Sequence, residues 1–174
     1  MTIYYLVNQN IGGSDSQFIF DHQMQPLMIL TGRFGLNQNG IRLLTIDGQY
    51  RGRVVHRKSN FAATYELQTD RRTLGQMTKM TGLWHQFAYV SNLKWTVLGS
   101  VTTNTYQVTH GIHPVFDAHS IVTSKKLDGL QLTLADDQDR IPAFLVAATL
   151  NQWVLLSQRK SKHLFNSFED IAIN

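Results

Sequence analysis

The feature that most constrains this chain is an apolar segment near its C-terminus, running from Asp139 to Leu156. We predict that residues 140–156 form one helix. Pro142 suits the first turn, where its missing N–H costs nothing, and Asp139 suits the N-cap position before it. Neither glycine nor a further proline interrupts the segment. The sequence therefore indicates one long helix close to the end of the chain.

The predicted helix has no polar face. Thr149 and Gln152 lie on the same side as Leu145, at helical spacings of four and seven residues. A helix that is apolar all round is either buried in protein or spans a bilayer. The stretch 141–156 is shorter than the about 20 residues that a spanning helix needs, and Asn151 interrupts it. We therefore predict a buried core helix around which the rest of the chain is arranged.

The sequence before this helix, over about residues 3–134, indicates short β-strands. β-Branched and aromatic residues alternate with polar ones, and turn signals separate the runs at close spacing. The strongest hairpin signal is Asp47-Gly48. Further turns are expected at Ser91-Asn92, at His110-Gly111 and at Asp117-Ala118, the last between strands at 115–116 and 121–125. In total the pattern predicts about a dozen strands.

The order of these elements predicts the fold class. No strand–helix–strand rhythm appears, which disfavours a parallel sheet, and a long antiparallel sheet relieves its edges as a sandwich or a barrel. Only a barrel has a lumen that buries a helix on every face. We predict a single, mainly β domain over residues 1–174: a closed antiparallel barrel of roughly twelve strands around a central hydrophobic C-terminal helix (about 140–156). The tail, 157–174, fits a helix, a packed coil or an added strand.

Composition narrows the chemistry. With 174 residues and 43% hydrophobic content, the chain can bury a sizeable core. It has no cysteine, which excludes disulfides, zinc–thiolate sites and cysteine nucleophiles. The N-terminus lacks the basic and apolar regions of a signal peptide, so we expect a cytoplasmic protein. The nucleophile-elbow, phosphate-loop and dinucleotide motifs are absent, so we expect neither enzyme activity nor a cofactor.

The charge is unevenly distributed. The formal net charge is +4, and the segment from Arg33 to Lys126 holds twelve Lys or Arg against four acids. Such a balance permits an anionic partner. Three acids, Asp136, Asp137 and Asp139, precede the predicted helix, where their charge suits its positive end. We prefer this structural role to a metal site.

The densest basic run is the candidate binding site. On a strand, Arg51, Arg53 and Arg57 share one face, and Lys58 and Lys125 are expected nearby. Several guanidinium groups on one barrel wall hold phosphate well, because arginine forms bidentate hydrogen bonds with phosphate oxygens. The alternative is a solvated outer strand face with no ligand.

Two other clusters receive a structural interpretation. Three histidines and an acid lie within ten residues and resemble a metal-ligand set: His110, His113, Asp117 and His119. A glycine turn and a proline break their spacing, so we predict that these histidines lie on the surface and bind no metal. A group of aromatic residues is predicted to lie in the core rather than to stack on nucleic-acid bases, since no basic residues alternate with them: Trp84, Phe87, Tyr89 and Trp95.

Four stretches together resemble a known family: FIFDHQMQPLMILTGRF, IRLLTIDGQYRGRVVHRK, VTSKKLDGLQLTLAD and DRIPAFLVAATLNQW. In this order they are similar to the LURP-one-related proteins of the tubby C-terminal-like superfamily, to which phospholipid scramblases are related. The resemblance implies a closed barrel threaded by a hydrophobic helix, and work at a membrane surface or as a scaffold. Tubby-type domains bind phosphoinositide headgroups through the barrel wall. The cysteine cluster and calcium segment of scramblases have no counterpart here.

Three functions follow from the sequence, in order of preference. The first is a non-enzymatic module that binds anionic phospholipid headgroups, in a cytoplasmic protein that is peripheral to the membrane. The second is a cytoplasmic scaffold or regulatory domain that binds a protein partner and no lipid. The third is a metal-dependent small-molecule enzyme that uses residues 110–119. A nucleic-acid partner is not expected, and the oligomeric state stays open.

Overall fold

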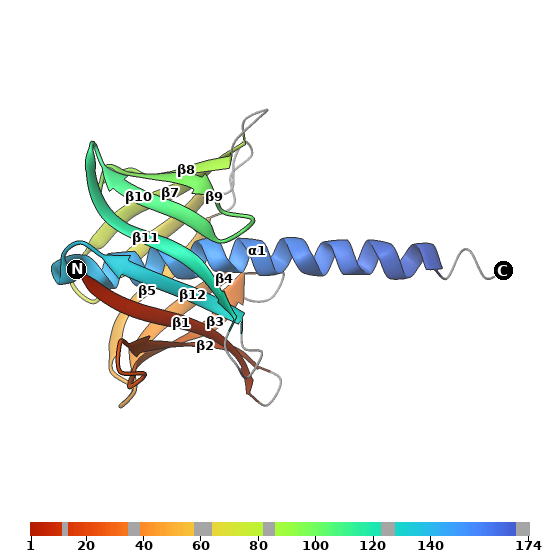
Figure 1. The fold of residues 1–174 in the computed structure, drawn as a ribbon, viewed down its shortest axis with the longest axis horizontal. Coiled ribbons are helices and arrows are strands. Elements are labelled where there is room, and N and C mark those ends of the chain that lie inside the picture. The colour runs from red at the N-terminus through yellow and green to blue at the C-terminus, as the bar shows by residue number, and fades with distance from the viewer. Residues whose placement is uncertain (12–13, 35–38, 58–63, 82–85, 123–127, 170–174) are drawn as a thin grey trace.

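The computed structural model describes residues 1–11, 14–34, 39–57, 64–81, 86–122 and 128–169. These residues form twelve strands, a short 3₁₀-helix and one α-helix (Figure 1). The strands are β1 (Thr2–Ile11), β2 (Ser14–Asp21), β3 (Pro26–Phe34), β4 (Asn39–Thr45), β5 (Tyr50–Arg57), β6 (Thr64–Thr69), β7 (Thr73–Thr81), β8 (Gln86–Val90), β9 (Trp95–Ser100), β10 (Thr105–His110), β11 (His113–Val122) and β12 (Asp128–Leu134). The helices are η1 (Asp137–Asp139) and α1 (Arg140–Glu169).

Each strand pairs antiparallel with its neighbours in sequence, and β1 pairs with β12, which closes the barrel. The predicted fold class is confirmed. The Asp47-Gly48 hairpin is also confirmed: Gly48 donates its N–H to the Thr45 carbonyl and has a φ of +88°, which glycine adopts without strain. The turn predicted at Asp117-Ala118 is wrong, because both residues lie inside β11. Ala118 is fully buried there, so this short apolar residue belongs to the core rather than to a loop.

The helix α1 runs through the lumen of the barrel, as predicted (Figure 1). Twelve consecutive residues, 143–154, are buried, so every face of the helix meets the wall. Phe144 lies edge-on to Tyr4 of β1, with ring centroids 5.0 Å apart, and Trp153 contacts Tyr65 of β6 at 5.1 Å. These contacts with distant strands show that the wall surrounds the helix.

Two polar residues of the buried helix, Thr149 and Asn151, have partners that explain their position. Thr149 donates its hydroxyl to the carbonyl of Leu145, one turn earlier, at 2.8 Å. Asn151 donates its Nδ2 to Asn8 Oδ1 at 2.8 Å, and Gln17 donates to the same oxygen at 3.0 Å. Hydrogen bonding removes most of the cost of burying such groups. Thr149 and Asn151 are therefore buried inside the barrel, and the helix has no polar face.

Both ends of the predicted helix need correction. At the start, the capping carboxylate is that of Asp136, which accepts from Gln138 N at 2.9 Å, whereas Asp139 is the last residue of η1. At the other end, the helix was predicted to stop at Leu156 but continues to Glu169 and leaves the barrel (Figure 1). The end of the apolar run at Leu156 does not end the helix. No glycine or proline follows within the helix, so nothing in residues 157–169 terminates it.

A carboxylate placed in the lumen should unfold the barrel. Leu145 and Ala148 are fully buried in α1. We expect Leu145→Asp or Ala148→Asp to cost more than about 4 kcal/mol, because an unpaired charge would be buried in an apolar core. Thermal unfolding followed by circular dichroism measures this effect. A soluble Leu145→Asp variant with an unchanged melting temperature would contradict the burial of α1.

The two acids at the start of α1 should affect stability in opposite directions. Burial, and then the charge of Asp136, raise the pKa of Asp139 above its ordinary value, whereas His110 lowers it. The folded state thus holds this proton more tightly than the unfolded chain, and stability is lost as pH rises through the folded-state pKa. We expect Asp139→Asn to raise the melting temperature at neutral pH, with a difference that shrinks toward about pH 4.

The matched control is Asp136→Ala, which removes the side-chain acceptor of Gln138 N and should cost about 1 kcal/mol. Melting curves of both variants between mildly acidic and neutral pH provide the comparison. A lower melting temperature for Asp139→Asn at neutral pH would mean that its charge stabilises the helix start instead.

Candidate anion-binding surface

The basic strand β5 divides its residues between the two faces of the barrel wall. Gly52 and Val54 are buried toward the lumen, whereas Arg51, Arg53 and Arg57 are exposed. The predicted common face of these three arginines is therefore the outer wall. The register with β4 shifts between Leu43 and Leu44, which face Gly52 and Tyr50, so Arg51 is the extra residue of a β-bulge. Lys58 and Lys125, the other predicted site residues, lie outside the described residues.

Two of these arginines have partners on β6. Arg57 Nε donates to Glu66 Oε2 at 2.9 Å, and Arg53 Nε donates to Gln68 Oε1 at 2.6 Å. Gln68 in turn donates to the other carboxylate oxygen of Glu66. Arg57 first, and Gln68 second, lower the pKa of Glu66. Arg57 is thus paired with a carboxylate, whereas the hydrogen-bond partner of Arg53 is an amide, and the charge of Arg53 makes a smaller contribution to the lowered pKa of Glu66.

Arg51 lies beside the hairpin turn of β4 and β5. The pKa of Asp47 is lowered mainly by the hydrogen bond from the Thr45 hydroxyl, and the positive charge of Arg51 contributes. The Asp47 carboxylate is held in the turn by Thr45. Arg51 therefore has an acidic neighbour but makes no side-chain hydrogen bond within the described part of the chain.

The structure adds one residue that the sequence analysis missed. Arg42 of β4 is exposed and lies directly opposite Arg53 of β5. Directly opposed side chains on neighbouring strands have β-carbons about 5 Å apart, and like charges there are destabilising. Among the described residues, Arg42 has no hydrogen bond or ion pair. This pairing could have been predicted from the sequence. Counting the same number of residues back from Asp47 and forward from Gly48 places Arg42 opposite Arg53.

A hollow of about 470 Å³ lies beside these two arginines, across β3, β4 and β5. Its lining consists of Thr31, Gly32, Gly40, Ile41, Arg42, Arg53, Val54 and Val55. Two of these positions require glycine. A β-carbon on Gly40 would lie 2.7 Å from the Val54 carbonyl oxygen, and one on Gly32, at a φ of +92°, would lie 2.4 Å from the Gly40 oxygen. Glycine at these positions lets the neighbouring backbone approach closely, and the hollow beside the two guanidiniums has room for a small group.

We call Thr31, Arg42, Arg53 and Gln68 the arginine row, because these residues face one another across four adjacent strands. A hydroxyl, two guanidiniums and an amide offer several hydrogen-bond donors on one exposed surface. Arg42 and Arg53 repel each other until an anion lies between them. Chemically, the arrangement suits a phosphate or carboxylate group, and it carries no nucleophile with an adjacent base.

The remaining sequence candidates are located as follows. His110 faces His113 across the β10–β11 turn, and His119 Nε2 lies 3.5 Å from Asp117 Oδ2. Within the described residues, no group of three His, Asp or Glu side chains is arranged to hold a metal ion. Trp95 is buried, as predicted for the aromatic group. Tyr89 is 37% exposed, so the prediction that it lies in the core is wrong. Trp84 and the side chain of Phe87 lie outside the described part of the structure.

The fold of this chain is similar to that of one protein of known structure. No protein-family model matches the chain, and no curated protein matches it. The chain is similar to an X-ray structure of a protein from Arabidopsis thaliana. The TM-score is 0.56 and the sequence identity is 15%, over 86% of this chain and 91% of that one. At this identity the likeness shows a shared barrel fold alone.

Within the described residues, no helix combines the length and the apolarity that crossing a membrane requires.

Removal of one charge from the arginine row should stabilise the barrel. We expect Arg42→Gln to raise the melting temperature at low ionic strength, because it removes the repulsion from Arg53 without removing a hydrogen bond. The gain should disappear in about 1 M salt, which screens exposed charges. Arg57→Gln is the control, and its melting temperature should not rise, because it breaks the pair with Glu66. Equal effects of the two variants would show that Arg42 carries no excess repulsion.

Proposed function

We propose that this protein is a non-enzymatic binding module that recognises anionic phospholipid headgroups through its arginine row. One observation carries the proposal: Arg42 and Arg53 face each other over a hollow, and Arg42 lacks a partner among the described residues. Like charges on adjacent strands cost stability in the unliganded protein, whereas a bound phosphate converts the repulsion into charge-assisted hydrogen bonds.

The shape of the site favours a phosphate on a larger group over a deeply enclosed small substrate. The arginine row is exposed on a barrel wall, and the buried residues of α1 occupy the lumen. A catalytic pocket normally encloses most of its substrate, which a wall of this kind does not do. The surface therefore suits a headgroup presented by a membrane.

The sequence resemblance supports the same proposal. The closed barrel with its central helix agrees with the architecture of the tubby C-terminal-like superfamily, some of whose members bind lipid headgroups on the barrel wall. We infer that this chain belongs with the LURP-one-related proteins. The arginine row then occupies a part of the wall that is available for an anionic membrane.

Vesicle co-sedimentation tests the proposal. Wild-type protein should sediment with vesicles that contain anionic phospholipid and not with neutral ones, and binding should weaken as salt is added. An arginine near an anionic surface contributes on the order of 1 kcal/mol, so Arg42→Ala combined with Arg53→Ala should weaken binding at least about tenfold. Arg57→Ala is the matched control and should cost less, because Glu66 already neutralises Arg57.

Two results would count against the proposal. If the wild-type protein ignores anionic vesicles at low salt, lipid binding is excluded, and the scaffold function with a protein partner takes its place. The helix that continues beyond the barrel to Glu169 would then be the first segment to test for that partner. If the Arg42 and Arg53 double variant binds as well as wild type, lipid is bound elsewhere on the protein.

A further inference from the structure

A second row of outward side chains lies beside the arginine row, and it is apolar. Four residues face one another on consecutive strands, and we call them the apolar row: Phe18 of β2, Ile29 of β3, Leu44 of β4 and Tyr50 of β5. Ile29 and Leu44 lie two residues from Thr31 and Arg42 on the same strands, so both rows are on the outer face. The two rows are about 7 Å apart, which is two residues along a strand.

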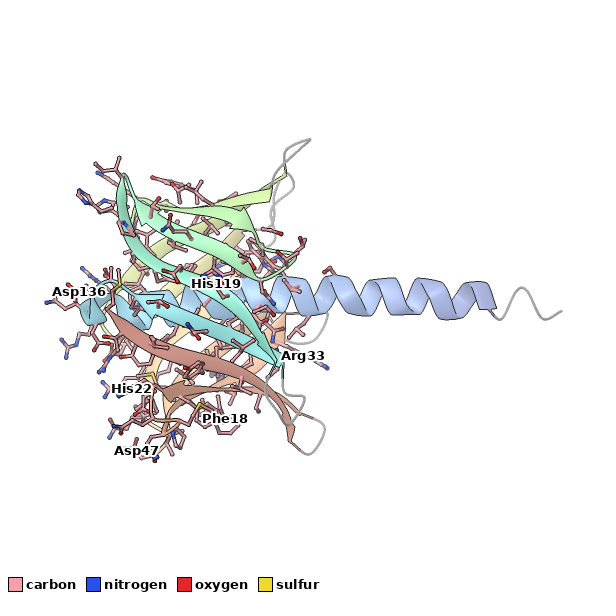
Figure 2. All side chains as sticks on the ribbon, viewed as in Figure 1. Phe18, His22, Arg33, Asp47, His119 and Asp136 are labelled. Atoms are coloured by element: carbon pink, nitrogen blue, oxygen red, sulfur yellow. The ribbon has the colours of Figure 1, made fainter. Side chains whose placement is uncertain are left out.

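The apolar row leads to two hairpin tips with exposed apolar side chains. Met24, in the β2–β3 turn, and Ile46, in the β4–β5 turn, are each 49% exposed, and Tyr50 is 39% exposed. Both tips lie at the end of the barrel where η1 begins, as the positions of His22, Asp47 and Asp136 show in Figure 2. From the wall to the tip of this hairpin, a cation and an aliphatic residue of β4, Arg42 and Leu44, are therefore followed by the aliphatic Ile46 in the turn.

The two acids at these tips, Asp21 and Asp47, accept hydrogen bonds within their own turns. Asp21 accepts from the backbone N–H groups of Gln23 and Gln25, at 2.9 and 2.8 Å. Asp47 accepts from the Thr45 hydroxyl and lies beside Arg51. Their negative charge is thus partly compensated by local hydrogen bonds. The tips do not oppose an anionic surface as strongly as free carboxylates would.

The spacing of these features fits the interface of a bilayer. Apolar side chains of interfacial proteins enter about 5–10 Å into the boundary between headgroups and acyl chains, while cations stay at the level of the phosphates. Arg42 and Leu44 are two residues apart along β4, about 7 Å in an extended strand, and Ile46 lies in the turn that follows Thr45. A barrel that inserts its β2–β3 and β4–β5 tips would thus hold the arginine row near the phosphate layer.

We propose that Met24, Ile46 and Tyr50 insert into the interfacial layer of an anionic bilayer, with the apolar row as the continuous base of this contact. The inference rests on the proposed lipid binding and adds its orientation: one side of one barrel end enters the membrane. Because α1 leaves the barrel at the other end, its last turns point away from the bilayer (Figure 1).

The chain offers a matched control for this orientation. Ile112, at the β10–β11 tip, is 90% exposed, more than Ile46. β10 and β11 are six strands away from β4 and β5 in the ring of twelve described strands, so Ile112 lies on the opposite side of the barrel. The chain has no cysteine, so Ile46→Cys and Ile112→Cys each accept one environment-sensitive fluorescent label at a single position.

The experiment adds vesicles of phosphatidylcholine with and without phosphatidylserine to each labelled protein. The label at position 46 should shift to the blue with the anionic vesicles only, and the label at position 112 should not respond. Separately, Met24→Asn combined with Ile46→Ser should weaken vesicle binding at least about tenfold. Its melting temperature should stay near that of wild type, because both residues are exposed and asparagine tolerates the φ of +60° at Met24.

Inorganic phosphate separates the failure of this inference from the failure of lipid binding. It should raise the melting temperature of wild type and of the Met24 and Ile46 variant equally, because the arginine row is intact in both. If wild type binds anionic vesicles while the label at position 46 stays silent, insertion is wrong and headgroup binding stands. If phosphate stabilises the protein but no vesicle binds, both the insertion and the lipid function are overturned.

Discussion

The part of α1 inside the barrel is buried on every face, and this burial requires a closed wall around it. Residues 143–154 are buried without a break, and an open sheet covers a helix on one side only. Pairing β1 with β12 closes the wall around the helix and also removes the exposed strand edges that favour aggregation. Because the helix takes up the lumen, the binding surface that we propose lies on the outside of the barrel.

The core and the candidate site meet at Gly52. A β-carbon there would lie 2.7 Å from the Gln68 carbonyl oxygen and 3.1 Å from Leu145 Cδ1, so the helix and the neighbouring strand both approach this residue closely. The flanking residues, Arg51 and Arg53, point outward from the same short segment. The packing that holds the helix thus also holds the arginines in place, which lowers the conformational cost of binding an anion.

The outer wall departs from what stability alone would select. Arg57 is matched by Glu66, but Arg42 and Arg53 are opposed like charges on neighbouring strands. Next to them, Phe18, Ile29, Leu44 and Tyr50 form an apolar row on the side of the wall that faces away from the core. Local conflicts of this kind are expected at functional surfaces, where a ligand rather than the fold completes the interactions. The two rows are neighbours, so one anionic, partly apolar surface would complete the interactions of both, as we propose.

The fold class and the outward face of β5 could be predicted from the sequence. An apolar helix without a polar side and strand alternation are local patterns that encode burial, and the Asp47-Gly48 turn is a local pattern that encodes a chain reversal. The structure was needed to show that β1 pairs with β12 and that the register of β3 with β4 places Ile29 opposite Leu44. It also placed Asp117-Ala118 inside a strand and carried α1 on to Glu169. Local patterns specify which way a side chain points, but its neighbours across strands depend on register, and bulges such as the one at Arg51 change that register.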